Sequence, residues 1–395
     1  MDEVLLNRQD ELIMKVVFLS NYFNHHQRFI SEELNRICDE YTFVATSEMR
    51  EERKKLGYGE ESLPGYVLKY GEDIMETVDD ITENCDVAIL GSAPLKIVKN
   101  RVKENRLVFR YSERQFKQGD NLVKYIPRFI KWHTHYPYNK KVYLLCASAY
   151  AAYDYGRYGV FKNKGYKWGY FPETKIYDVE ELMQKKDRNH ILWCGRFLDW
   201  KHPDDVIKAV KRLYDDGYSF AIDFIGNGVM EDTLKAMVKE ASLEKCVSFL
   251  GSMKPYEVRI HMERAGIYLF TSDKREGWGA VLNESMNSGC AVIASHAIGS
   301  VPYLVEDNEN GLIYRSGDVD MLYEKIKYLL DNPHKQERLG REAYKTITEE
   351  WNADIAAQRL VKLSEKILSG EKYPDLYDRG PCSRADMIKD DWFGG

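Results

Sequence analysis

The stretch Glu276-Gly277-Trp278-Gly279-Ala280-Val281-Leu282-Asn283-Glu284 decides the fold of this chain. The apolar residues 267–270 precede it and have the pattern of a buried strand. A helical pattern then covers residues 280–288 and ends at Gly289, and residues 291–294 form a second apolar run. A strand, a glycine-bearing loop, a helix and a strand make a βαβ unit. The loop is therefore expected at the carboxyl edge of a parallel sheet, where α/β folds bind ligands.

Two carboxylates flank the expected start of this helix. Glu276 lies in the loop and Glu284 lies about one turn into the helix, with seven residues between them. The free backbone N–H groups and the positive dipole end of a helix N-terminus favour an anion such as phosphate. Carboxylates beside a phosphate do not bind the phosphate itself, so we expect them to hold hydroxyl groups. A ligand with a phosphate centre and hydroxyls on both sides is a nucleotide sugar.

Composition narrows the class of protein. The length of 395 residues favours two or three domains, and a net charge of -6 argues against a general nucleic-acid binder. The seven cysteines are scattered singly without a CxxC pair, which favours reduced, buried thiols. The first residues have neither a cationic start nor an apolar core, and no apolar run has the length of a membrane span. We therefore expect a soluble, cytoplasmic protein, with peripheral association at the inner face of the membrane as the second interpretation.

Strand patterns alternate with helical patterns in two successive sets. The expected strands of the first set are residues 13–19, 41–45, 67–69, 86–90, 107–111 and 142–147. Those of the second set are residues 191–194, 220–225, 247–250, 267–270, 291–294 and 312–314. The expected helices include residues 25–38, 203–214, 230–241, 255–264, 280–288, 318–330, 335–349 and 352–368. This alternation predicts an α/β protein with two doubly wound, parallel-sheet, Rossmann-like domains that face each other across a cleft.

The expected domain boundaries follow from the same pattern. Residues 1–180 form an N-terminal Rossmann-like domain and residues 187–350 a C-terminal one, with the charged piece 180–189 as the linker. Residues 351–395 form a C-terminal helix and tail that we expect to pack back toward the N-terminal domain.

A second informative stretch is Cys194-Gly195-Arg196-Phe197-Leu198-Asp199-Trp200-Lys201-His202-Pro203, directly after the first strand of the second set. Arg196 and Lys201 are thus expected at the carboxyl edge of the sheet. There they can neutralise a diphosphate, Arg bidentately and Lys as a point charge. The alternative is that both are solvated charges of a surface loop.

These motifs resemble those of the retaining, family 4 glycosyltransferases of the GT-B fold. The resemblance rests on motifs that follow one another in order: Gly195-Arg196 with Lys201, Phe224-Ile225-Gly226-Asn227-Gly228, Phe249-Leu250-Gly251, the Glu-x7-Glu run, Gly289-Cys290-Ala291-Val292-Ile293-Ala294-Ser295 and Asp307-Asn308-Glu309-Asn310-Gly311-Leu312. It covers Gly195 to about Leu368, and it extends to the first half only in architecture.

The resemblance implies a donor site in residues 187–350 and acceptor recognition in residues 1–180. It implies that Arg196 and Lys201 bind the donor diphosphate, that Glu284 holds the ribose and that Glu276 lies near the transferred sugar. Glu276, Arg196 and Lys201 are the expected catalytic residues. The other residues that it implies at the donor are Gly226, Gly228, Gly277, Trp278, Gly279, Ala280, Val281 and Met253. The donor is expected to be UDP- or GDP-linked, and no cofactor is expected.

The first half departs from the family's pattern. Residues 21–25 contain no glycine where many relatives have a glycine-rich loop. The expected strand 107–111 ends in Ser112-Glu113-Arg114 where relatives tend to carry a histidine. Glu113 and Arg114 are therefore candidates for the reaction-centre side of the cleft, and His25 and His26 are the others. A histidine at a helix mouth is equally compatible with a capping or packing role.

No metal site is expected from the sequence. Asp318 and Asp320 have the spacing of a metal-binding motif, but their place at an expected helix start indicates an N-cap. His133 and His135 have zinc-ligand chemistry without supporting cysteines or carboxylates. We expect Arg196, Lys201 and the helix dipole to stabilise the negative charge on the leaving diphosphate instead.

Basic residues gather in the segment 95–106, which carries Lys96, Lys99, Arg101, Lys103 and Arg106. They indicate either a solvated helix face or a contact with an anionic membrane that presents a lipid-linked acceptor. The leading hypothesis is a retaining glycosyltransferase that moves a sugar onto a glycan or lipid-linked acceptor in bacterial surface polysaccharide assembly. The alternatives are a phosphorylase or epimerase of the same fold, and a catalytically silent homologue that binds sugars or assists a partner.

Overall fold

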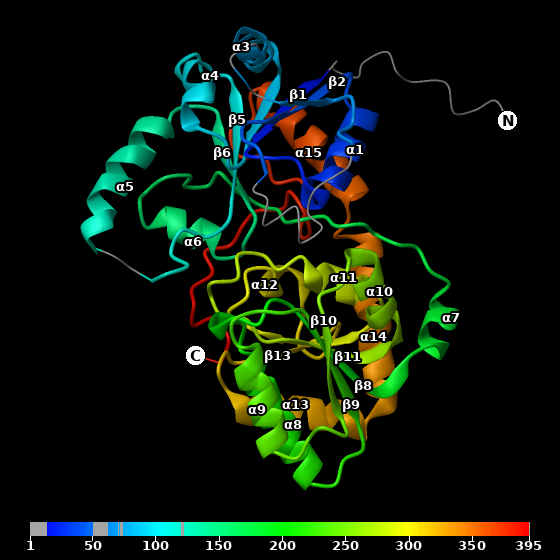
Figure 1. The fold of residues 1–395 in the computed structure, drawn as a ribbon. Helices are drawn as coiled ribbons and strands as arrows, with labels where there is room; N and C mark the ends of the chain where they lie inside the picture. Colours follow the sequence, from blue (N-terminus) through cyan, green and yellow to red (C-terminus); the bar gives the residue numbers. More distant parts are fainter. Residues whose placement is uncertain (1–13, 50–61, 70, 72–73, 120–121, 395) are drawn as a thin grey trace, which may run out of the picture.

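The computed structural model describes residues 14–49, 62–69, 71, 74–119 and 122–394. It contains two parallel sheets, one in each half of the chain, with helices on both faces, and the two halves face each other (Figure 1). The expected α/β fold class with two Rossmann-like domains is confirmed.

The N-terminal sheet has seven parallel strands in the order β3-β2-β1-β4-β5-β6-β7. Its strands are β1 (Lys15–Ser20), β2 (Glu40–Ala45), β3 (Val67–Lys69), β4 (Val87–Leu90), β5 (Leu107–Ser112), β6 (Val142–Cys146) and β7 (Gly165–Lys167). Its helices are α1 (His25–Ile37), α3 (Met75–Asn84), the 3₁₀ turn η3 (Leu95–Val98), α4 (Lys99–Lys103), α5 (Leu122–His135) and α6 (Ala151–Gly156). The strand order reverses between β1 and β4, so loops after these strands open on one crevice at the carboxyl edge.

The C-terminal sheet has six parallel strands in the order β10-β9-β8-β11-β12-β13. Its strands are β8 (Asp187–Cys194), β9 (Ala221–Ile225), β10 (Val247–Gly251), β11 (Ala265–Phe270), β12 (Ala291–Ser295) and β13 (Leu312–Tyr314). The helices from the connection between the halves onward are α7 (Val179–Gln184), α8 (Pro203–Asp215), α9 (Glu231–Glu240), α10 (Pro255–Arg264), α11 (Val281–Asn287), α12 (Val301–Leu304), α13 (Val319–Asp331), α14 (Pro333–Glu349) and α15 (Ala353–Leu368). The order reverses between β8 and β11, so the loops that carry Lys201 and Glu276 are neighbours.

The strands are buried on both faces because they are nearly continuous apolar runs. All six residues of β11 and all five of β12 are buried. The helices instead bury only one stripe of apolar side chains. In α8, Pro203 stands at the first helical position, and Val206, Val210 and Leu213 point into the core at spacings of four and three. Strand β11 is therefore a rigid support for the loop that follows it and carries Glu276.

Several helices and strands differ from expectation because the local sequence pattern does not determine whether they form. Residues 180–189 were expected to be a linker, but they contain most of α7 and the start of β8. The helices α3, α5 and α6 and the edge strand β7 were not expected. The sequence of α3 is largely polar, and α5 contains Pro127, which normally interrupts a helical pattern.

The C-terminal segment lies on both halves of the chain. The helix α15 packs on α1, where Arg36 pairs with Asp354. Beyond it, the backbone of residues 382–385 bonds to β7, since Lys167 N–H donates to Ser383 O and Ala385 N–H donates to Gly165 O. The chain thus returns from the C-terminal sheet to the edge of the N-terminal one (Figure 1).

One cation of the basic segment 95–106 is buried, whereas Lys96, Lys99 and Lys103 are exposed. The segment forms η3 and the short helix α4, and Arg101 within it is only 1% exposed. The Arg101 guanidinium donates hydrogen bonds to the backbone carbonyl oxygens of Thr82, Glu83, Cys85, Asp86 and Leu107. Arg101 is therefore a structural cation that joins the end of α3 to β5, and the expectation that it lies on a charged surface is wrong.

Replacing Arg101 tests this role. We expect Arg101→Met to lower the free energy of unfolding by about 3 kcal/mol, because several buried carbonyl oxygens lose a charged donor. The exposed Lys99 of the same helix provides the matched control, and Lys99→Met should change stability by less than about 0.5 kcal/mol. Urea unfolding followed by circular dichroism measures both. Equal midpoints for the two variants would contradict the structural role.

Candidate active site

A cavity of about 320 Å³ lies between the two halves of the chain. Its lining comes from the N-terminal end of α1, from the segments after β5 and β7, and from the carboxyl ends of β8 and β11 with α10 and α11. The lining residues are His25, His26, Glu113, Tyr170, Cys194, Gly195, Arg196, Trp200, Lys201, Met253, Pro255, Val258, Glu276, Gly279, Ala280, Val281 and Glu284. The structure therefore brings together most of the site residues that the sequence predicted.

Lys201 and Glu276 form an ion pair in this cavity. The Lys201 Nζ donates to Glu276 Oε2, to which Ser272 Oγ also donates at 3.1 Å. The side chains of Lys201 and Glu276 are only 12% and 15% exposed. An ammonium group has three N–H donors, so Lys201 can keep this bond and still donate to a phosphate oxygen. The pair places one positive and one negative group side by side on the wall of the C-terminal domain.

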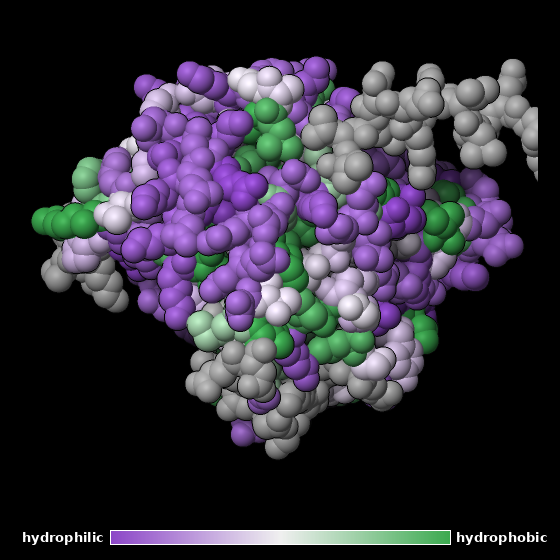
Figure 2. Space-filling model, turned by 90° about the horizontal axis from the view of Figure 1, so that it is seen from above, coloured by the Kyte–Doolittle hydropathy of each residue, from purple (hydrophilic) through white to green (hydrophobic). Residues whose placement is uncertain are grey.

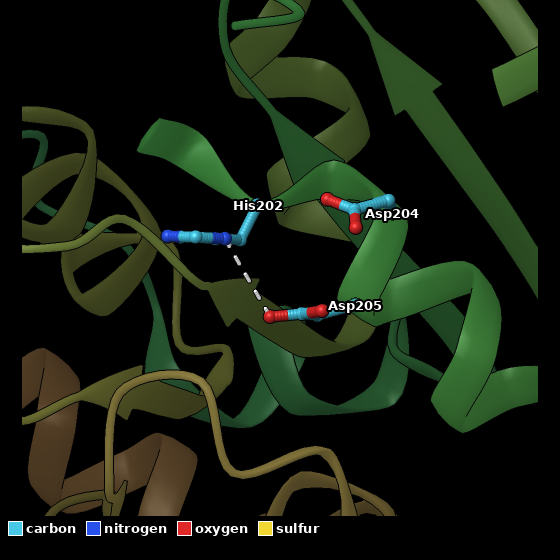
Figure 3. Close-up of side chains that lie close together, drawn as sticks. All are labelled: His202, Asp204 and Asp205. Carbon is cyan, nitrogen blue, oxygen red and sulfur yellow. Dashed lines mark ion pairs between the residues drawn. The ribbon is translucent and has the colours of Figure 1, made fainter. Parts of the chain in front are cut away.

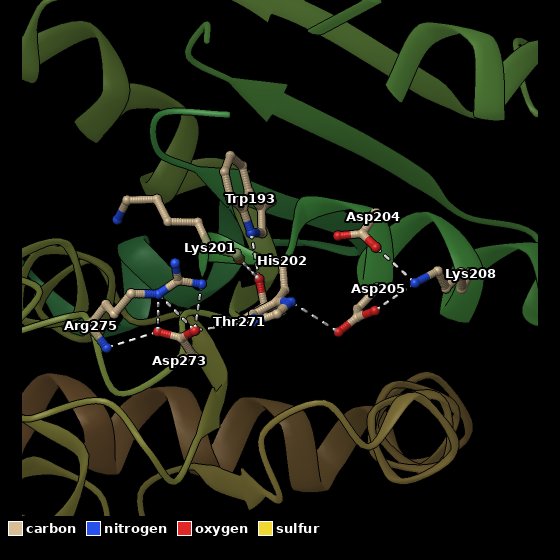
Figure 4. A network of polar contacts seen from close by, with 9 residues as sticks. All are labelled: Trp193, Lys201, His202, Asp204, Asp205, Lys208, Thr271, Asp273 and Arg275. Carbon is tan, nitrogen blue, oxygen red and sulfur yellow. Dashed lines mark hydrogen bonds and ion pairs between the residues drawn. The ribbon is translucent and has the colours of Figure 1, made fainter. Parts of the chain in front are cut away.

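A chain of buried hydrogen bonds fixes the segment that carries Lys201 (Figure 4). The Trp193 Nε1–H donates to Thr271 Oγ1 at 2.9 Å, and the Thr271 hydroxyl donates to the Lys201 carbonyl oxygen at 2.6 Å. The Asp273 N–H donates to the Trp200 carbonyl oxygen at 2.9 Å. Because Trp193 is the second-last residue of β8 and Thr271 directly follows β11, the loops after these neighbouring strands are tied together.

His202 and Asp273 continue this network. His202 takes a left-handed backbone conformation (φ 49°) immediately before α8, and its ring lies 3.6 Å from carboxylate oxygens of both Asp205 and Asp273. The hydrogen bond to Asp273 raises the pKa of His202 against the opposing effect of burial. Burial would raise the pKa of Asp273, but bonds from His202 and Arg275 outweigh it and hold that pKa well below its usual range. The interactions of Asp273 with His202 and Arg275 therefore stabilise the loop after β11.

His202, Asp204 and Asp205 also form a group whose ligand atoms lie within 4.8 Å of one another (Figure 3). In the described part of the chain the Lys208 Nζ already neutralises this group, at 2.7 Å from Asp204 and 2.9 Å from Asp205. The group belongs to the start of α8 and lies outside the lining of the cavity. It therefore fits an ion-pair network at the start of α8. Asp318 does cap its helix, because its carboxylate accepts from Met321 N–H as the predicted N-cap.

Glu284 stands on α11 with its carboxyl group toward the cavity. Burial raises the pKa of Glu284 to about 7, Arg259 opposes this change and Glu173 adds to it. The helix is held in place from behind, because Arg259 Nη1 donates to the Glu284 carbonyl oxygen at 3.0 Å and Nη2 donates to Asn287 Oδ1. A desolvated carboxyl group with this pKa gains strongly from hydroxyl donors when it is ionised.

Arg196 extends from the loop after β8 and is exposed at the cavity. Within the described residues its guanidinium makes no hydrogen bond or ion pair with another side chain. The loop itself is fixed, since Phe197 N–H donates to the Asn227 carbonyl oxygen at 2.7 Å. A Cβ atom at Gly226 would lie 1.9 Å from the Gly195 carbonyl oxygen. Gly226 and Gly228 were expected to bind the donor, but the structure places them behind this loop, where they permit its close packing.

Gly277 and Trp278 also lie behind the cavity wall. Trp278 is 0% exposed and packs against Tyr303 and Trp351, with its Nε1–H donating to Asn283 Oδ1 at 2.9 Å. Its aromatic ring is thus part of the core. A Cβ atom at Gly277 would lie 2.2 Å from the Glu113 carboxylate of the other domain, so only glycine permits this approach.

The N-terminal wall carries His25, His26, Glu113 and Tyr170. The rings of His25 and His26 lie 3.9 Å apart, and His26 stacks on Tyr170 at 5.3 Å. The Tyr170 hydroxyl donates to Glu113 Oε1 at 2.6 Å, and Lys117 pairs with the same carboxylate. Burial lowers the pKa of His25 to about 4, so its imidazole is neutral at pH 7. This wall therefore offers the Glu113 carboxylate and the neutral imidazole of His25 opposite Glu276 and Lys201.

Arg114 does not reach this cavity. It lines a neighbouring one of about 540 Å³ together with Arg157, Lys274 and Asp390, on the other side of the segment after β5. Its side chain is 2% exposed and pairs with Asp390 at 2.8 Å. Arg114 was expected at the reaction centre beside Glu113, but adjacent residues of an extended segment point to opposite sides.

Sequence reasoning missed part of the lining. Cys194, Trp200, Pro255 and Val258 line the cavity. Cys194 and Trp200 belong to the stretch that already contained Arg196 and Lys201, and Pro255 starts the helix after β10 at the same sheet edge. Strand-end position is the signal that could have found them.

Four aromatic residues of the N-terminal half, Trp132, Tyr136, Tyr166 and Trp168, are buried and pack in the core.

The sequence of residues 177–346 matches the family model "Glycosyl transferases group 1". A glycosyltransferase of amylovoran biosynthesis from Erwinia amylovora is 28% identical over 182 residues, which are 45% of this chain and 44% of that protein. An N-acetylgalactosamine-N,N'-diacetylbacillosaminyl-diphospho-undecaprenol 4-alpha-N-acetylgalactosaminyltransferase from Campylobacter jejuni is 31% identical over 163 residues, 39% of this chain and 42% of that protein. The matches thus span less than half the length of these two relatives.

Solved structures share the fold of about nine tenths of this chain. HepE from Anabaena, crystallised with UDP, superposes with a TM-score of 0.67 over 90% of this chain and 100% of that chain, at 15% identity. A glycosyltransferase from Rickettsia africae gives a TM-score of 0.67 over 91% of this chain and 100% of that chain, at 13% identity. The two facing Rossmann-like domains therefore have the GT-B arrangement, and residues 177–346 are similar to the group 1 glycosyltransferases.

Proposed function

We propose that the protein transfers a sugar from a nucleoside-diphosphate sugar to a glycan or lipid-linked acceptor, with retention at the anomeric carbon and without a metal ion. The observation that carries this proposal is the set of charges in the cavity. Lys201 and the exposed Arg196 lie at the end of β8, and the carboxyl groups of Glu276 and Glu284 flank the start of α11. This set matches the parts of a nucleotide sugar in order.

In the proposed complex the diphosphate lies between Arg196 and Lys201. The ribose hydroxyls donate to Glu284, and the base lies over Met253 and Val258, where α10 begins. The transferred sugar lies at Glu276, between the C-terminal wall and the histidines of α1. The diphosphate leaves with developing negative charge, which Arg196 and Lys201 stabilise as it forms. Glu276 then contacts the sugar and also orients the Lys201 ammonium group through their ion pair.

The acceptor is proposed to enter on the N-terminal wall. Glu113 faces Gly277, and its carboxylate is held by Tyr170 and Lys117, so it can accept a hydrogen bond from an acceptor hydroxyl. The relative from Campylobacter jejuni acts, by its name, on a diphospho-undecaprenol-linked saccharide, and the one from Erwinia amylovora serves amylovoran biosynthesis. These names support a lipid-linked or glycan acceptor and a role in bacterial surface polysaccharide assembly. The motifs that resemble family 4 enzymes support retention.

The ion pair gives the first test of the proposed reaction. We expect Lys201→Ala and Glu276→Ala each to lower kcat for release of nucleoside diphosphate by about 100-fold or more, because each removes charge stabilisation from the transition state. Lys239→Ala, at an exposed lysine of α9, should keep full activity. The assay uses UDP- and GDP-linked sugars with isolated lipid-linked saccharides as acceptors. A wild-type protein that releases no nucleoside diphosphate from any donor would favour the silent homologue.

Glu284 gives a second test through pH. With a pKa of about 7, Glu284 is largely protonated at pH 6, and hydroxyl donors of the ribose bind its ionised form. Binding must therefore release a proton below pH 7, and we expect affinity for UDP-glucose to fall about tenfold from pH 8 to pH 6. The diphosphate diester of UDP-glucose does not titrate in this range. Calorimetry in buffers of different ionisation enthalpy counts the proton.

The matched variant for this test is Glu284→Gln, which keeps the size of the side chain and cannot ionise. It should bind UDP-glucose without proton release and without the fall between pH 8 and pH 6. A pH dependence that persists in Glu284→Gln would assign the proton to another group and remove Glu284 from the ribose site.

A further inference from the structure

The neighbouring cavity of about 540 Å³, called the second cavity below, lies where three parts of the chain meet. Arg114 and Arg157 line it from the N-terminal half, and Lys274 lines it from the loop after β11. Residues 389–391 line it from the C-terminal tail, which crosses between the two halves (Figure 1). Hydrophilic residues predominate on the outer face of the N-terminal half, with apolar residues in separate patches (Figure 2). The second cavity lies instead at the junction of the halves.

Positive charge from all three parts of the chain gathers in the second cavity. Its cations are Arg114, Arg157, Lys274 and Lys389. Lys274 and Lys389 are exposed, and within the described residues neither ammonium group forms an ion pair. The cavity can therefore offer charged donors to an anionic group of a ligand.

Arg114 is the buried cation of this group. Its side chain is 2% exposed, and its guanidinium lies 4.6 Å from the centre of the Tyr150 ring. The Arg114 Nη2 pairs with Asp390 at 2.8 Å, and Nε lies 3.4 Å from the Asp154 carboxylate. In the described part of the chain the Nη1 atom has no hydrogen-bond partner. A buried N–H donor without an acceptor is unfavourable, so this guanidinium can accommodate a further ligand oxygen.

The two carboxylates beside Arg114 differ in kind. Asp154 is 1% exposed, and its Oδ2 accepts from the N–H groups of Gln115 at 2.7 Å and Phe116 at 3.0 Å, so it holds the segment after β5 in place. The side chain of Asp390 is 54% exposed and belongs to the tail. A guanidinium matches a carboxylate in geometry and can bind it through two N–H groups. The Asp390 carboxylate thus identifies the chemical group that this cavity holds at Arg114.

The second cavity adjoins the proposed reaction centre. Glu113 lines the donor cavity and Arg114 lines the second one, on opposite sides of one extended segment. The loop after β11 divides in the same way, since Glu276 lines the donor cavity and Lys274 the second one. A saccharide with a hydroxyl group at Glu113 therefore has the second cavity beside it. The volume of the cavity lies within the range of about 300–1,000 Å³ that ligand pockets have.

We propose that the second cavity is an acceptor subsite for a sugar that carries a carboxylate, namely a uronic acid residue of a glycan. The sugar carboxylate replaces that of Asp390 on Arg114, and Lys274 and Lys389 add positive charge beside it. The role as an acceptor subsite rests on the proposed sugar transfer. Binding of the carboxylate itself requires neither a donor nor catalysis.

The test is an NMR titration of the full-length protein, without a sugar donor, with the methyl glycosides of glucuronic and galacturonic acid. The methyl glycosides of glucose and galactose are the neutral counterparts, and a phosphorylated methyl glucoside is the third probe. We expect a uronide to bind with a Kd about tenfold or more below that of its neutral counterpart, because only the uronide has a charged acceptor for Arg114.

The variants separate binding at Arg114 from a purely structural ion pair. Asp390→Asn should lower the Kd for the uronide about fivefold, because it removes the competing carboxylate. The matched control is Asp386→Asn, a tail carboxylate that pairs with Lys167 at 3.3 Å outside the cavity, and it should leave the Kd unchanged. Lys274→Ala should raise the Kd about threefold, and Lys239→Ala, at an exposed lysine of α9, should not change it.

Three outcomes overturn the proposal: equal affinity for the uronides and their neutral counterparts, an unchanged or higher Kd in Asp390→Asn, and tighter binding of the phosphorylated glucoside than of either uronide. The last would assign the cavity to a phosphorylated ligand. Circular dichroism checks that each variant folds. The titration reads binding alone and the release of nucleoside diphosphate reads transfer, so failure of this subsite and failure of the proposed function are distinguishable.

Discussion

The ion pair between Lys201 and Glu276 is the interaction on which the donor side of the cavity depends. It joins the loops after β8 and β11, whose backbones are already tied by Thr271 and Asp273. Both charges are largely withdrawn from solvent, so loss of one leaves the other poorly compensated and costs several kcal/mol. The pair therefore determines both the shape and the electrostatics of this side of the cavity, because separating the two side chains would leave two poorly solvated charges.

The facing wall is held against this pair by close contacts between the domains. Gly277 allows the Glu113 carboxylate to approach the loop, and the backbone of Ala149 bonds to Gly299 across the two halves. The C-terminal tail adds a third tie, because Trp392 Nε1–H donates to the Tyr150 hydroxyl at 2.9 Å while the Phe393 ring packs near His296. A reacting sugar between these walls would meet side chains of both domains, which is the geometry that a two-substrate transfer requires.

Much of the second half could be predicted from sequence because its strands are continuous apolar runs and its longer helices have a periodic apolar stripe. The bounds of α10 and β13 agree with expectation, and Lys201, Glu276 and Glu284 were found from their places after buried strands. The placement of Trp278 and Arg114 outside the cavity could not be predicted, since their burial depends on partners distant in sequence, such as Trp351 and Asp390. The helix α5 was missed because Pro127 interrupts its pattern.

The most direct measurement for the central claim is a crystal structure of the protein with an intact nucleotide sugar. The account predicts that phosphate oxygens lie about 2.8 Å from Lys201 Nζ and from the Arg196 guanidinium, as charge-assisted hydrogen bonds do, with the ribose at Glu284. The neighbouring cavity also carries cations, namely Arg114, Arg157, Lys274 and Lys389. A diphosphate bound there, with the cavity at Lys201 and Glu276 unchanged, would contradict the account.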